Sequence, residues 1–492
     1  MNQPAQLQST GTAFMPYRLP PEGVPADVFP FVHDERCHLF FMLPERGQIG
    51  HHSSTDLLHW EQHPIAIGRG YPGEPDCRGV ATGSVVHHAG RFYLFYTGNQ
   101  NICLATSEDL NTWVKHPLNP ILIPDGRLYG LANFRDPFVF RCPEDGRWWM
   151  IWGAQEAGRW GQRAGCVALA KSDDLLRWEL HPPLWAPRIG PHCDCPQLIE
   201  HGGRWYLFYL QRNTRYRIAD RPTGPFVRPP VRDLYTAKAN AGSRPVWFRG
   251  RWIAFLFVTR LKADDDFAPW RFGGPMAIPR ELVFGTDGSV GDRPLTEHID
   301  ALLSLPPHNP LRTHHVIAGE WQISEPDSLA RCDSPAGGTL LLPDAPSDLY
   351  FDALATIDDP HAAGHLLLRV AVRTMLHEGY QLSLRADVGR VELRAISTYD
   401  IDPLIDLRDA SIPVGRPFRI QLVLSGSILE CFVGERVSMT SRIYRHRDGG
   451  MALESRDGRV TFSGIRIRAL TAAPEPPASP PAESATTARS VC

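Results

Sequence analysis

The sequence lacks the features that would direct a protein across a membrane or onto nucleic acid. Residues 1–25 are polar and proline-rich, without the basic start and apolar run of a secretory signal. The chain has no uninterrupted apolar stretch long enough to span a bilayer, and no long block of lysine and arginine. Its formal net charge of -3 gives no electrostatic reason to bind nucleic acid or an anionic membrane. We therefore expect a cytoplasmic protein with a neutral small-molecule or oligosaccharide substrate; the sequence leaves its oligomeric state open.

Cysteines in paired spacings are also missing, with one exception. The ten cysteines are scattered over the chain, which is typical of reduced thiols in a cytosolic protein. The exception, Cys193-Asp194-Cys195, is a poor zinc site because no histidine or cysteine cluster accompanies it, so packing is the simpler interpretation. The acidic run from Asp264 to Asp266 is interpreted as a solvated loop, because three adjacent side chains do not supply the roughly six to eight oxygens of a calcium site. We therefore expect neither a metal nor a cofactor.

An internal repeat dominates the first 300 residues. Five segments start with arginine and continue as an aromatic-rich strand after a short turn; they begin at Arg36, Arg91, Arg147, Arg204 and Arg251. Each is expected to be the centre of a β-hairpin. A period near 50 residues with several short strands is typical of a β-propeller with one four-stranded blade per repeat, so five copies predict five blades.

A second signature, Ser-x-Asp-Leu-x-x-Trp, follows the first three copies. It occurs at Ser54–Trp60, Ser107–Trp113 and Ser172–Trp178. We expect its aspartates to form turns and most of the aromatic side chains of the repeats to pack between blades.

The chain is long enough for two or more domains. After Pro306-Pro307 the repeat ends, and short alternating strands with polar turns indicate a β-sandwich. The Pro/Ala/Ser-rich C-terminus cannot bury enough apolar surface to order itself. We thus predict an all-β protein with an N-terminal extension (1–24), a five-bladed β-propeller (25–305), a linker (306–320), a β-sandwich (321–470) and a disordered tail (471–492).

Three aspartates stand at equivalent strand entrances in blades one, three and four. They are Asp27, Asp136 and Asp194, each followed by an apolar run. Because the innermost strands of a propeller line its central axis, we expect these carboxylates to surround one pocket, with Thr82, Ser84 and Arg244 at the same level in blades two and five. Several carboxylates in one pocket are the equipment for glycoside hydrolysis, and Arg135 or Arg244 would hold a neighbouring carboxylate ionised.

An ordered series of motifs resembles glycoside hydrolase family 32, the β-fructofuranosidase, invertase and levanase family, which is related to families 43 and 68. The motifs are Gly50–Ile67, Ala81–Ser84, Phe134–Pro137, Asp194–Pro196, Asp233–Ala237 and Ile278–Leu282, with Ser427–Val433 and Thr440–Tyr444 in the sandwich. The resemblance implies that Asp27 is the nucleophile, Asp136 the transition-state stabiliser that binds sugar hydroxyls, and Asp194 the general acid/base.

The departures from that family fall on the groups that grip fructose. Its first motif reads Trp-Met-Asn-Asp-Pro-Asn-Gly, whereas Val24–Pro30 keeps only the aspartate; Met42 replaces a glutamine, and Ala81 and Thr82 replace Phe-Ser. The acid/base position is Asp194 instead of glutamate. We expect a glycosidase or transglycosidase acting on a furanoside-like bond, and sucrose to be a poor substrate. The predicted substrate-binding residues are Arg135, Trp60, Thr82, Ser84, Met42 and Arg244.

Two other functions remain open. A carbohydrate-binding propeller without turnover is favoured by the glutamate-to-aspartate change at Asp194, and non-hydrolytic chemistry on a hydrophobic metabolite is favoured by Phe29, Met42 and Ala81. Retention is the expected stereochemical outcome, with inversion as the alternative. Glu156 is the next candidate if Asp194 is not the acid.

Overall fold

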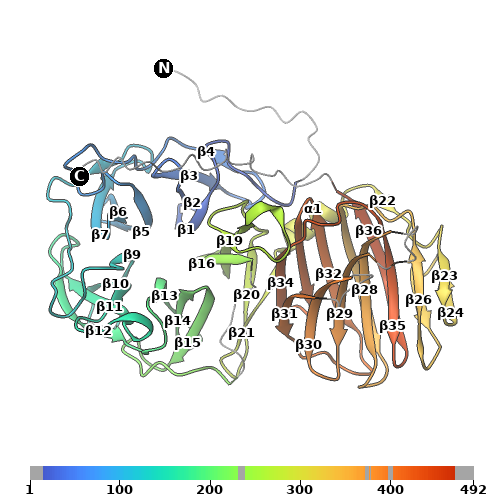
Figure 1. Ribbon diagram of the computed structural model, residues 1–492. Coiled ribbons are helices and arrows are strands. Elements are labelled where there is room, and N and C mark those ends of the chain that lie inside the picture. The colour runs from blue at the N-terminus through green and yellow to red at the C-terminus, as the bar shows by residue number, and fades with distance from the viewer. Residues whose placement is uncertain are drawn as a thin grey trace, which may run out of the picture.

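The computed structural model describes residues 15–470, except 231–235, 237, 238, 372–375, 377 and 397–402. Figure 1 shows two bodies side by side, a propeller formed by the N-terminal part of the chain and a sandwich formed by the C-terminal part. The predicted fold class, an all-β protein with a five-bladed propeller followed by a β-sandwich, is confirmed. No helix in the described part of the chain has the length and apolar character that crossing a bilayer requires. The predicted disordered tail lies outside the described residues.

Five sheets make the blades, each starting with its innermost strand. Blade one contains β1 (Ala26–His33), β2 (Arg36–Leu43), β3 (Gln48–Ser54) and β4 (Glu61–Gln62); blade two contains β5 (Val80–His88), β6 (Arg91–Gly98), β7 (Asn101–Ser107) and β8 (Val114–Lys115). Blade three contains β9 (Arg135–Arg141), β10 (Trp148–Gln155), β11 (Gly165–Ser172) and β12 (Glu179–Trp185); blade four contains β13 (Asp194–His201), β14 (Arg204–Gln211) and β15 (Asn213–Ala219). Blade five contains β16 (Asn240–Phe248), β17 (Arg251–Val258), β20 (Arg280–Phe284) and β21 (Val290–Pro294), with an inserted pair β18 (Arg260–Leu261) and β19 (Trp270–Arg271).

The sequence repeat maps onto the second strand of every blade. Strands β2, β6, β10, β14 and β17 carry the five aromatic-rich segments and pair with the innermost strands. Their buried aromatic side chains form the apolar clusters within and between blades, as predicted. The innermost strands β1, β5, β9, β13 and β16 contact one another in this cyclic order, so the ring is closed.

The Ser-x-Asp-Leu-x-x-Trp signature forms the same turn three times. In the first copy, Asp56 accepts hydrogen bonds from two backbone N–H groups, Leu57 has a positive φ of 65°, and the Trp60 indole donates to the Leu57 carbonyl at 3.1 Å. The copies centred on Asp109 and Asp174 repeat these contacts. The prediction that these aspartates form turns is confirmed.

Two antiparallel sheets form the sandwich, connected to the propeller by helix α1 (Thr296–Leu303). The β27 sheet has the order β24 (Trp321–Ser324), β25 (Leu329–Cys332), β36 (Val460–Ala469), β27 (Leu349–Ile357), β32 (Phe418–Ser425), β33 (Ile428–Val433) and β34 (Val437–Arg442), with β22 (Pro307–His308) pairing β36. The β28 sheet has the order β23 (His315–Ala318), β26 (Gly337–Leu342), β35 (Gly450–Arg456), β28 (Ala363–Val370), β29 (Gly379–Arg385), β30 (Arg390–Ile396) and β31 (Leu404–Asp409). Leucine, isoleucine and phenylalanine side chains from both sheets form the core between them.

Two sequence-based expectations need correction here. The segment 306–320, expected to be a linker, contributes β22 and β23 to the two sandwich sheets. The acidic run was expected in a solvated loop, but Asp266 is buried and accepts hydrogen bonds from the Tyr444 backbone N–H and the Tyr380 hydroxyl of the sandwich. The carboxylate is satisfied by these donors, which fasten blade five to the sandwich.

Candidate active site

Each of the three aspartates lies at an irregularity in the first residues of an innermost strand. Asp27 occupies a bulge between Ala26 and Val28 with a φ of 33°, and Asp136 lies in a bulge of β9 with a φ of 64°. Asp194 directly precedes a bulge in β13. A bulge redirects the side chain of a strand residue, and non-glycine residues with positive φ are concentrated at functional sites. In all three blades, an irregularity in strand pairing therefore positions the carboxylate.

Asp27 is held by neighbouring blades. Its Oδ2 accepts a hydrogen bond from the Thr82 hydroxyl at 3.1 Å, and the same hydroxyl lies 3.2 Å from the Met42 sulfur. On the other side, a Cβ added to Gly242 would come within 2.8 Å of Asp27 Oδ1, and Gly242 itself has a φ of 66°. Blade five thus approaches this carboxylate so closely that a side chain at Gly242 would collide with it.

Asp136 links blades two, three and four. Its backbone N–H donates to the Thr97 hydroxyl at 2.8 Å, and its Oδ2 accepts the Cys195 backbone N–H at 3.1 Å. Cys195 follows Asp194, so this bond fixes the distance between two of the three aspartates. Asp136 is 4% exposed, which leaves its carboxyl group mostly desolvated.

Asp194 carries the strongest cationic partner. The Arg135 guanidinium donates two hydrogen bonds to it, from Nε at 3.2 Å and from Nη2 at 2.8 Å, and His192 Nδ1 lies 2.9 Å from its Oδ2. Arg135 Nε is also 3.9 Å from Asp136 Oδ2, so one guanidinium connects two carboxylates. The predicted juxtaposition of Arg135, Asp136 and Asp194 is present in the structure.

These environments separate the proton affinities of the three groups. Burial, followed by repulsion from Asp136, raises the pKa of Asp27 to about 7. Burial and the charge of Asp194 also raise the pKa of Asp136. Burial opposes ionisation of Asp194 too, but His192 and Arg135 outweigh it and lower the pKa of that carboxyl group. Near neutral pH Asp194 is therefore ionised, and a proton is held by the neighbouring pair Asp27 and Asp136.

Arg244 and Ser84 bond to the backbone. Arg244 is 2% exposed; its Nη1 donates to the Gly83 carbonyl and its Nη2 to the Asp136 carbonyl at 3.1 Å. Blades two and three are not neighbours of blade five in the ring, so the Arg244 side chain crosses the propeller axis. The Ser84 hydroxyl accepts the Val139 backbone N–H at 3.1 Å and thereby joins β5 to β9. Inter-blade hydrogen bonds account for both residues.

Trp60 and Glu156 are not brought together with the carboxylates. The Trp60 ring packs edge-on against Phe255 at 5.8 Å, beneath the guanidinium of Arg18 at 5.2 Å, between blades one and five. Glu156 forms an ion pair with Arg159 at 2.7 Å in the loop after β10. Packing between blades explains Trp60, in agreement with the behaviour expected of most aromatic residues in the repeats.

The described residues contain one group of side chains with the composition of a metal site, His38, His51 and His63 in blade one. The rings of His51 and His63 are stacked at 4.3 Å with an interplanar angle of 19°, so their in-plane lone pairs run side by side instead of converging on one ion. His38 Nδ1 and His51 Nε2 form a hydrogen bond of 3.0 Å, and His63 Nε2 contacts the Ser53 hydroxyl at 2.7 Å. Hydrogen bonding and stacking account for this cluster.

His192, Thr97 and Gly242 are residues of the site that sequence reasoning did not identify. His192 lies two residues before Asp194, so its proximity to that carboxylate was a detectable signal. Thr97 follows the aromatic run of β6, and its contact with Asp136 spans 39 residues of sequence. The role of Gly242 depends on a close approach between blades, for which the sequence offers no local pattern.

Comparisons with known proteins find relatives in sequence and in fold. Residues 30–217 match the family described as "Glycosyl hydrolases family 32 N-terminal domain". The match includes Asp136 and Asp194 but begins after Asp27, where the first motif departs from the family pattern.

Two curated relatives illustrate the likeness in sequence. The chain is 26% identical over 436 residues to "Raffinose invertase" of Escherichia coli, covering 81% of each chain. It is 37% identical over 167 residues to "Sucrose-6-phosphate hydrolase" of Klebsiella pneumoniae, covering 30% of this chain and 33% of that protein.

Solved structures share the whole two-body architecture. Fructan 1-exohydrolase IIa from Cichorium intybus superposes with a TM-score of 0.65 at 17% identity, covering 93% of this chain and 98% of that one. Sucrose-6-phosphate hydrolase from Lactobacillus gasseri gives a TM-score of 0.67 at 19% identity, covering 91% of both chains. The matched domain and the curated relatives make this chain a family 32-like glycoside hydrolase, a β-fructofuranosidase-like enzyme that hydrolyses O-glycosyl bonds, and the solved structures share its fold.

Proposed function

We propose that the enzyme cleaves a furanoside-like glycosidic bond in a substrate other than plain sucrose, using Asp27, Asp136 and Asp194. The observation that carries this proposal is the placement of the three carboxylates at irregularities of three innermost strands, with Asp136 and Asp194 joined through Arg135 and Cys195. Two carboxyl groups on either side of a glycosidic bond are the minimum for its hydrolysis with acid and nucleophilic assistance.

In this proposal each aspartate has a separate role. Asp27 attacks the anomeric carbon, Asp136 binds sugar hydroxyls, and Asp194 protonates the leaving oxygen and later activates water. Sugar hydroxyls that donate to Asp27 and Asp136 would favour the ionised forms of these carboxyl groups and release the proton held between them. Substrate binding would therefore help to move the site toward its productive protonation state.

Proton donation by Asp194 is the demanding step. The carboxyl group of a general acid must be protonated before the bond breaks, whereas Arg135 and His192 lower the pKa of Asp194. The productive arrangement, with Asp27 ionised and Asp194 protonated, is then a minor state of the site. We expect turnover to favour substrates with good leaving groups, because these need little protonation to depart.

The substrate is proposed to differ from sucrose because of three apolar residues near the nucleophile. Ala26, Met42 and Ala81 stand where the related enzymes have polar or aromatic groups, and the Met42 sulfur lies against the Thr82 hydroxyl that binds Asp27. A lost hydrogen bond to a sugar hydroxyl costs about 0.5–1.5 kcal/mol, and several together would weaken the binding of plain sucrose substantially.

The proposal is tested with purified enzyme on sucrose, short fructans and aryl furanosides and pyranosides. We expect Asp27→Asn and Asp136→Asn each to lose most turnover while remaining folded. Arg159→Gln, which alters an ion pair outside the carboxylate group, is the matched control. Near-normal turnover of either aspartate variant would remove that residue from the mechanism, and rapid release of glucose from sucrose would contradict the proposed specificity.

The role of Asp194 and the stereochemistry need two further measurements. We expect Asp194→Ala to keep activity on a substrate with an activated leaving group far better than on an alkyl glycoside. Equal losses on both would exclude Asp194 as the acid. NMR observation of the first anomer formed separates retention, which the proposal expects, from inversion.

A carbohydrate-binding protein without turnover is the second candidate. The observation that favours it is the double clamp of Arg135 and His192 on Asp194, which holds this carboxyl group in the form that cannot donate a proton. Tight binding of an oligosaccharide together with no cleavage of any activated furanoside would select this alternative.

We also propose a reducing compartment such as the cytoplasm. Eight cysteines among the described residues are buried as free thiols, so the apolar core in this part of the chain holds them reduced. Unchanged stability on addition of a thiol reductant is the expected result, and a reductant-dependent loss of stability would contradict it.

A further inference from the structure

A polar row crosses the outer face of the β28 sheet in the sandwich, far along the chain from the three aspartates. The strand registers place Thr339, Glu454, His365, Ser383 and Glu392 side by side on five adjacent strands. Paired residues of neighbouring strands share one face of a sheet. The intervening residues, such as Leu366 and Leu384, point into the sandwich core, so the polar row faces outward.

This outward-facing row is nevertheless covered. His365 is 3% exposed, Ser383 is 2% exposed and Glu392 is 6% exposed, which is unusual for polar residues on the outer face of a sheet. Three arginines from the flanking positions, Arg385, Arg394 and Arg456, surround a pocket of about 390 Å³ above the row. The pocket has the size of a small-molecule site and a predominantly polar lining.

One donor in this pocket lacks a partner. His365 Nδ1 lies 2.8 Å from the Ser383 hydroxyl and 3.1 Å from Gln381 Nε2, while its Nε2 is buried without a hydrogen-bond partner among the described residues. Gln381 Nε2 also donates to the Ser383 hydroxyl at 2.9 Å, which completes a network at the floor of the pocket. The contact with the Gln381 amide makes Nδ1 the acceptor, so Nε2 carries the proton. A buried N–H without an acceptor destabilises a fold, and a ligand oxygen would satisfy it.

The charges around the pocket are balanced. Arg385 is paired with Asp387, Arg394 with Glu392, and Arg456 with Glu454. With its guanidinium groups neutralised in this way, the pocket has little surplus charge to attract an anion. It offers alternating donors and acceptors, which suits hydroxyl groups because each hydroxyl both donates and accepts.

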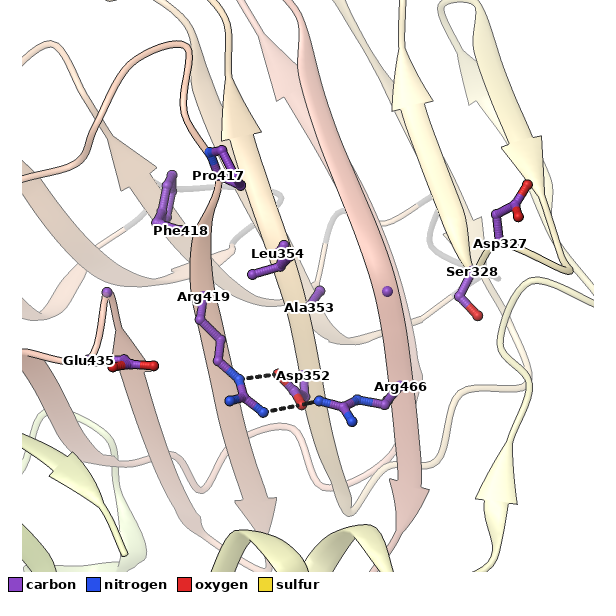
Figure 2. A pocket seen from close by; sticks show the side chains of 12 residues that line it. Asp327, Ser328, Asp352, Ala353, Leu354, Pro417, Phe418, Arg419, Glu435 and Arg466 are labelled. Atoms are coloured by element: carbon purple, nitrogen blue, oxygen red, sulfur yellow. Dashed lines mark hydrogen bonds and ion pairs between the residues drawn. The ribbon is translucent and has the colours of Figure 1, made fainter. Parts of the chain in front are cut away.

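On the opposite outer face of the sandwich, a cluster of charged side chains has all its hydrogen bonds satisfied within the protein. There, a hollow of about 830 Å³ on the β27 sheet contains Asp352, whose carboxylate accepts two hydrogen bonds of 2.9 Å from Arg419 and another from Arg466 (Figure 2). None of the described residues that line this hollow has a buried polar atom without a partner. The larger hollow on the β27 face is therefore not the better candidate for a ligand site. The β28 face is distinguished by the Nε2–H of His365, which is unpartnered among the described residues.

We propose that the outer face of the β28 sheet is a second carbohydrate-binding site, in which one glycosyl unit of a neutral sugar accepts a hydrogen bond from His365 Nε2 and contacts the arginine rim. Such a site would hold part of an oligosaccharide on the sandwich while the propeller acts on another part or another molecule. The proposal rests on the sandwich alone, so it stands or falls independently of the roles proposed for the three aspartates.

The test follows the ring signals of His365 by NMR in the full-length Asp27→Asn variant, which prevents turnover of the probe. The signals are assigned by their disappearance in His365→Leu, or by their perturbation in Gln381→Leu if the first variant fails to fold. We expect sucrose, raffinose or 1-kestose to shift these signals in a saturable manner.

Two matched variants give the binding site its sharpest test. Arg385→Ala removes a bidentate arginine from the β28 face, and Arg419→Ala removes one from the β27 face. Loss of a bond to a charged donor weakens binding about tenfold, so Arg385→Ala should raise the apparent dissociation constant by this factor while Arg419→Ala leaves it unchanged. Equal effects of the two variants, or no sugar-dependent shift at His365, would overturn the proposal. A shift with inorganic phosphate or sulfate but with none of the sugars would overturn the assigned ligand class.

Discussion

The propeller axis and the propeller–sandwich interface both bury arginines among carboxylates, but they treat the charges differently. At the interface, Arg280 is fully buried and donates to Asp292 at 3.2 Å, to the Ser438 hydroxyl at 2.7 Å and to Glu430. Hydroxyl groups complete both carboxylates, since Thr440 donates to Glu430 at 2.8 Å and Ser438 donates to Asp292 at 2.9 Å. Each carboxylate of this cluster therefore accepts hydrogen bonds from Arg280 and from one hydroxyl group.

The three aspartates of the propeller have fewer cations available to them. Arg244 is committed to backbone carbonyls, and Arg135 lies mainly against Asp194. Asp27 keeps one buried oxygen, Oδ1, without a hydrogen-bond partner among the described residues. Both groups of carboxylates are buried, so burial alone does not distinguish them. The comparison shows that buried carboxylates without a full set of cationic or hydrogen-bonding partners are the ones available for chemistry.

The largest expected effect comes from breaking the complete cluster. Arg280→Met leaves Glu430 and Asp292 buried without their cation and should lower the free energy of unfolding by about 3–5 kcal/mol, measured by chemical denaturation. The matched control is Arg293→Met, which removes a partly exposed arginine whose partner is Glu281 at 2.8 Å. Its expected cost is below about 1 kcal/mol. If the two variants lowered the free energy of unfolding equally, the burial of the Arg280 cluster would not explain the effect of Arg280→Met.

Asp27→Asn should act in the opposite direction and stabilise the protein. The folded pKa of about 7 lies above the ordinary value of 3.8, so the folded state holds this proton more tightly and stability falls as the pH rises from 3.8 to 7. A shift of this size corresponds to at most about 4 kcal/mol, which an uncharged asparagine would recover at neutral and alkaline pH. Denaturation at several pH values measures it; a gain that is as large below pH 3.8 as above pH 7 would contradict this explanation.

Arg135→Gln should move the acid limb of the pH–activity profile. The guanidinium lowers the pKa of Asp194, so its loss should raise that pKa. Protonation of Asp194 would then begin at higher pH, and the acid limb of kcat/KM would shift upward with it. The same measurement tests the alkaline side, where activity should fall above about pH 7 as the site loses the proton held by Asp27. An unchanged profile in the variant would exclude Arg135 as the group that controls Asp194.

The smallest expected effect concerns Trp60. Trp60→Phe keeps an aromatic ring against Phe255 but removes the indole N–H that bonds to the Leu57 carbonyl. The expected loss of stability is about 0.5–1.5 kcal/mol with an unchanged KM. A clear rise in KM at constant stability would instead support the prediction that Trp60 binds substrate.

Local pattern in the sequence was sufficient for the fold. The arginine-aromatic repeat and the Ser-x-Asp-Leu-x-x-Trp turn are determined by residues close in sequence, so the number of blades, the second strand of each blade and the turn-forming role of Asp56 followed from them. The equivalence of the three strand entrances followed in turn from the blade repeat.

Contacts between blades could not be predicted in the same way. The partners of Arg244 lie 161 and 108 residues away, and nothing near Arg244 in the sequence indicates that it binds carbonyl groups. The protonation pattern was also out of reach, because it depends on which aspartate Arg135 contacts. The short strands in 306–320 were missed for a related reason, since a strand of two to four residues gains its identity from its partner in the sheet.

The Arg244 side chain also limits the path by which substrate and products can move through the propeller. A guanidinium that reaches from blade five to the carbonyls of blades two and three obstructs the middle of the propeller, so a sugar chain cannot thread from one end to the other. Substrate must therefore reach the three aspartates, and products must leave them, through the same end of the propeller.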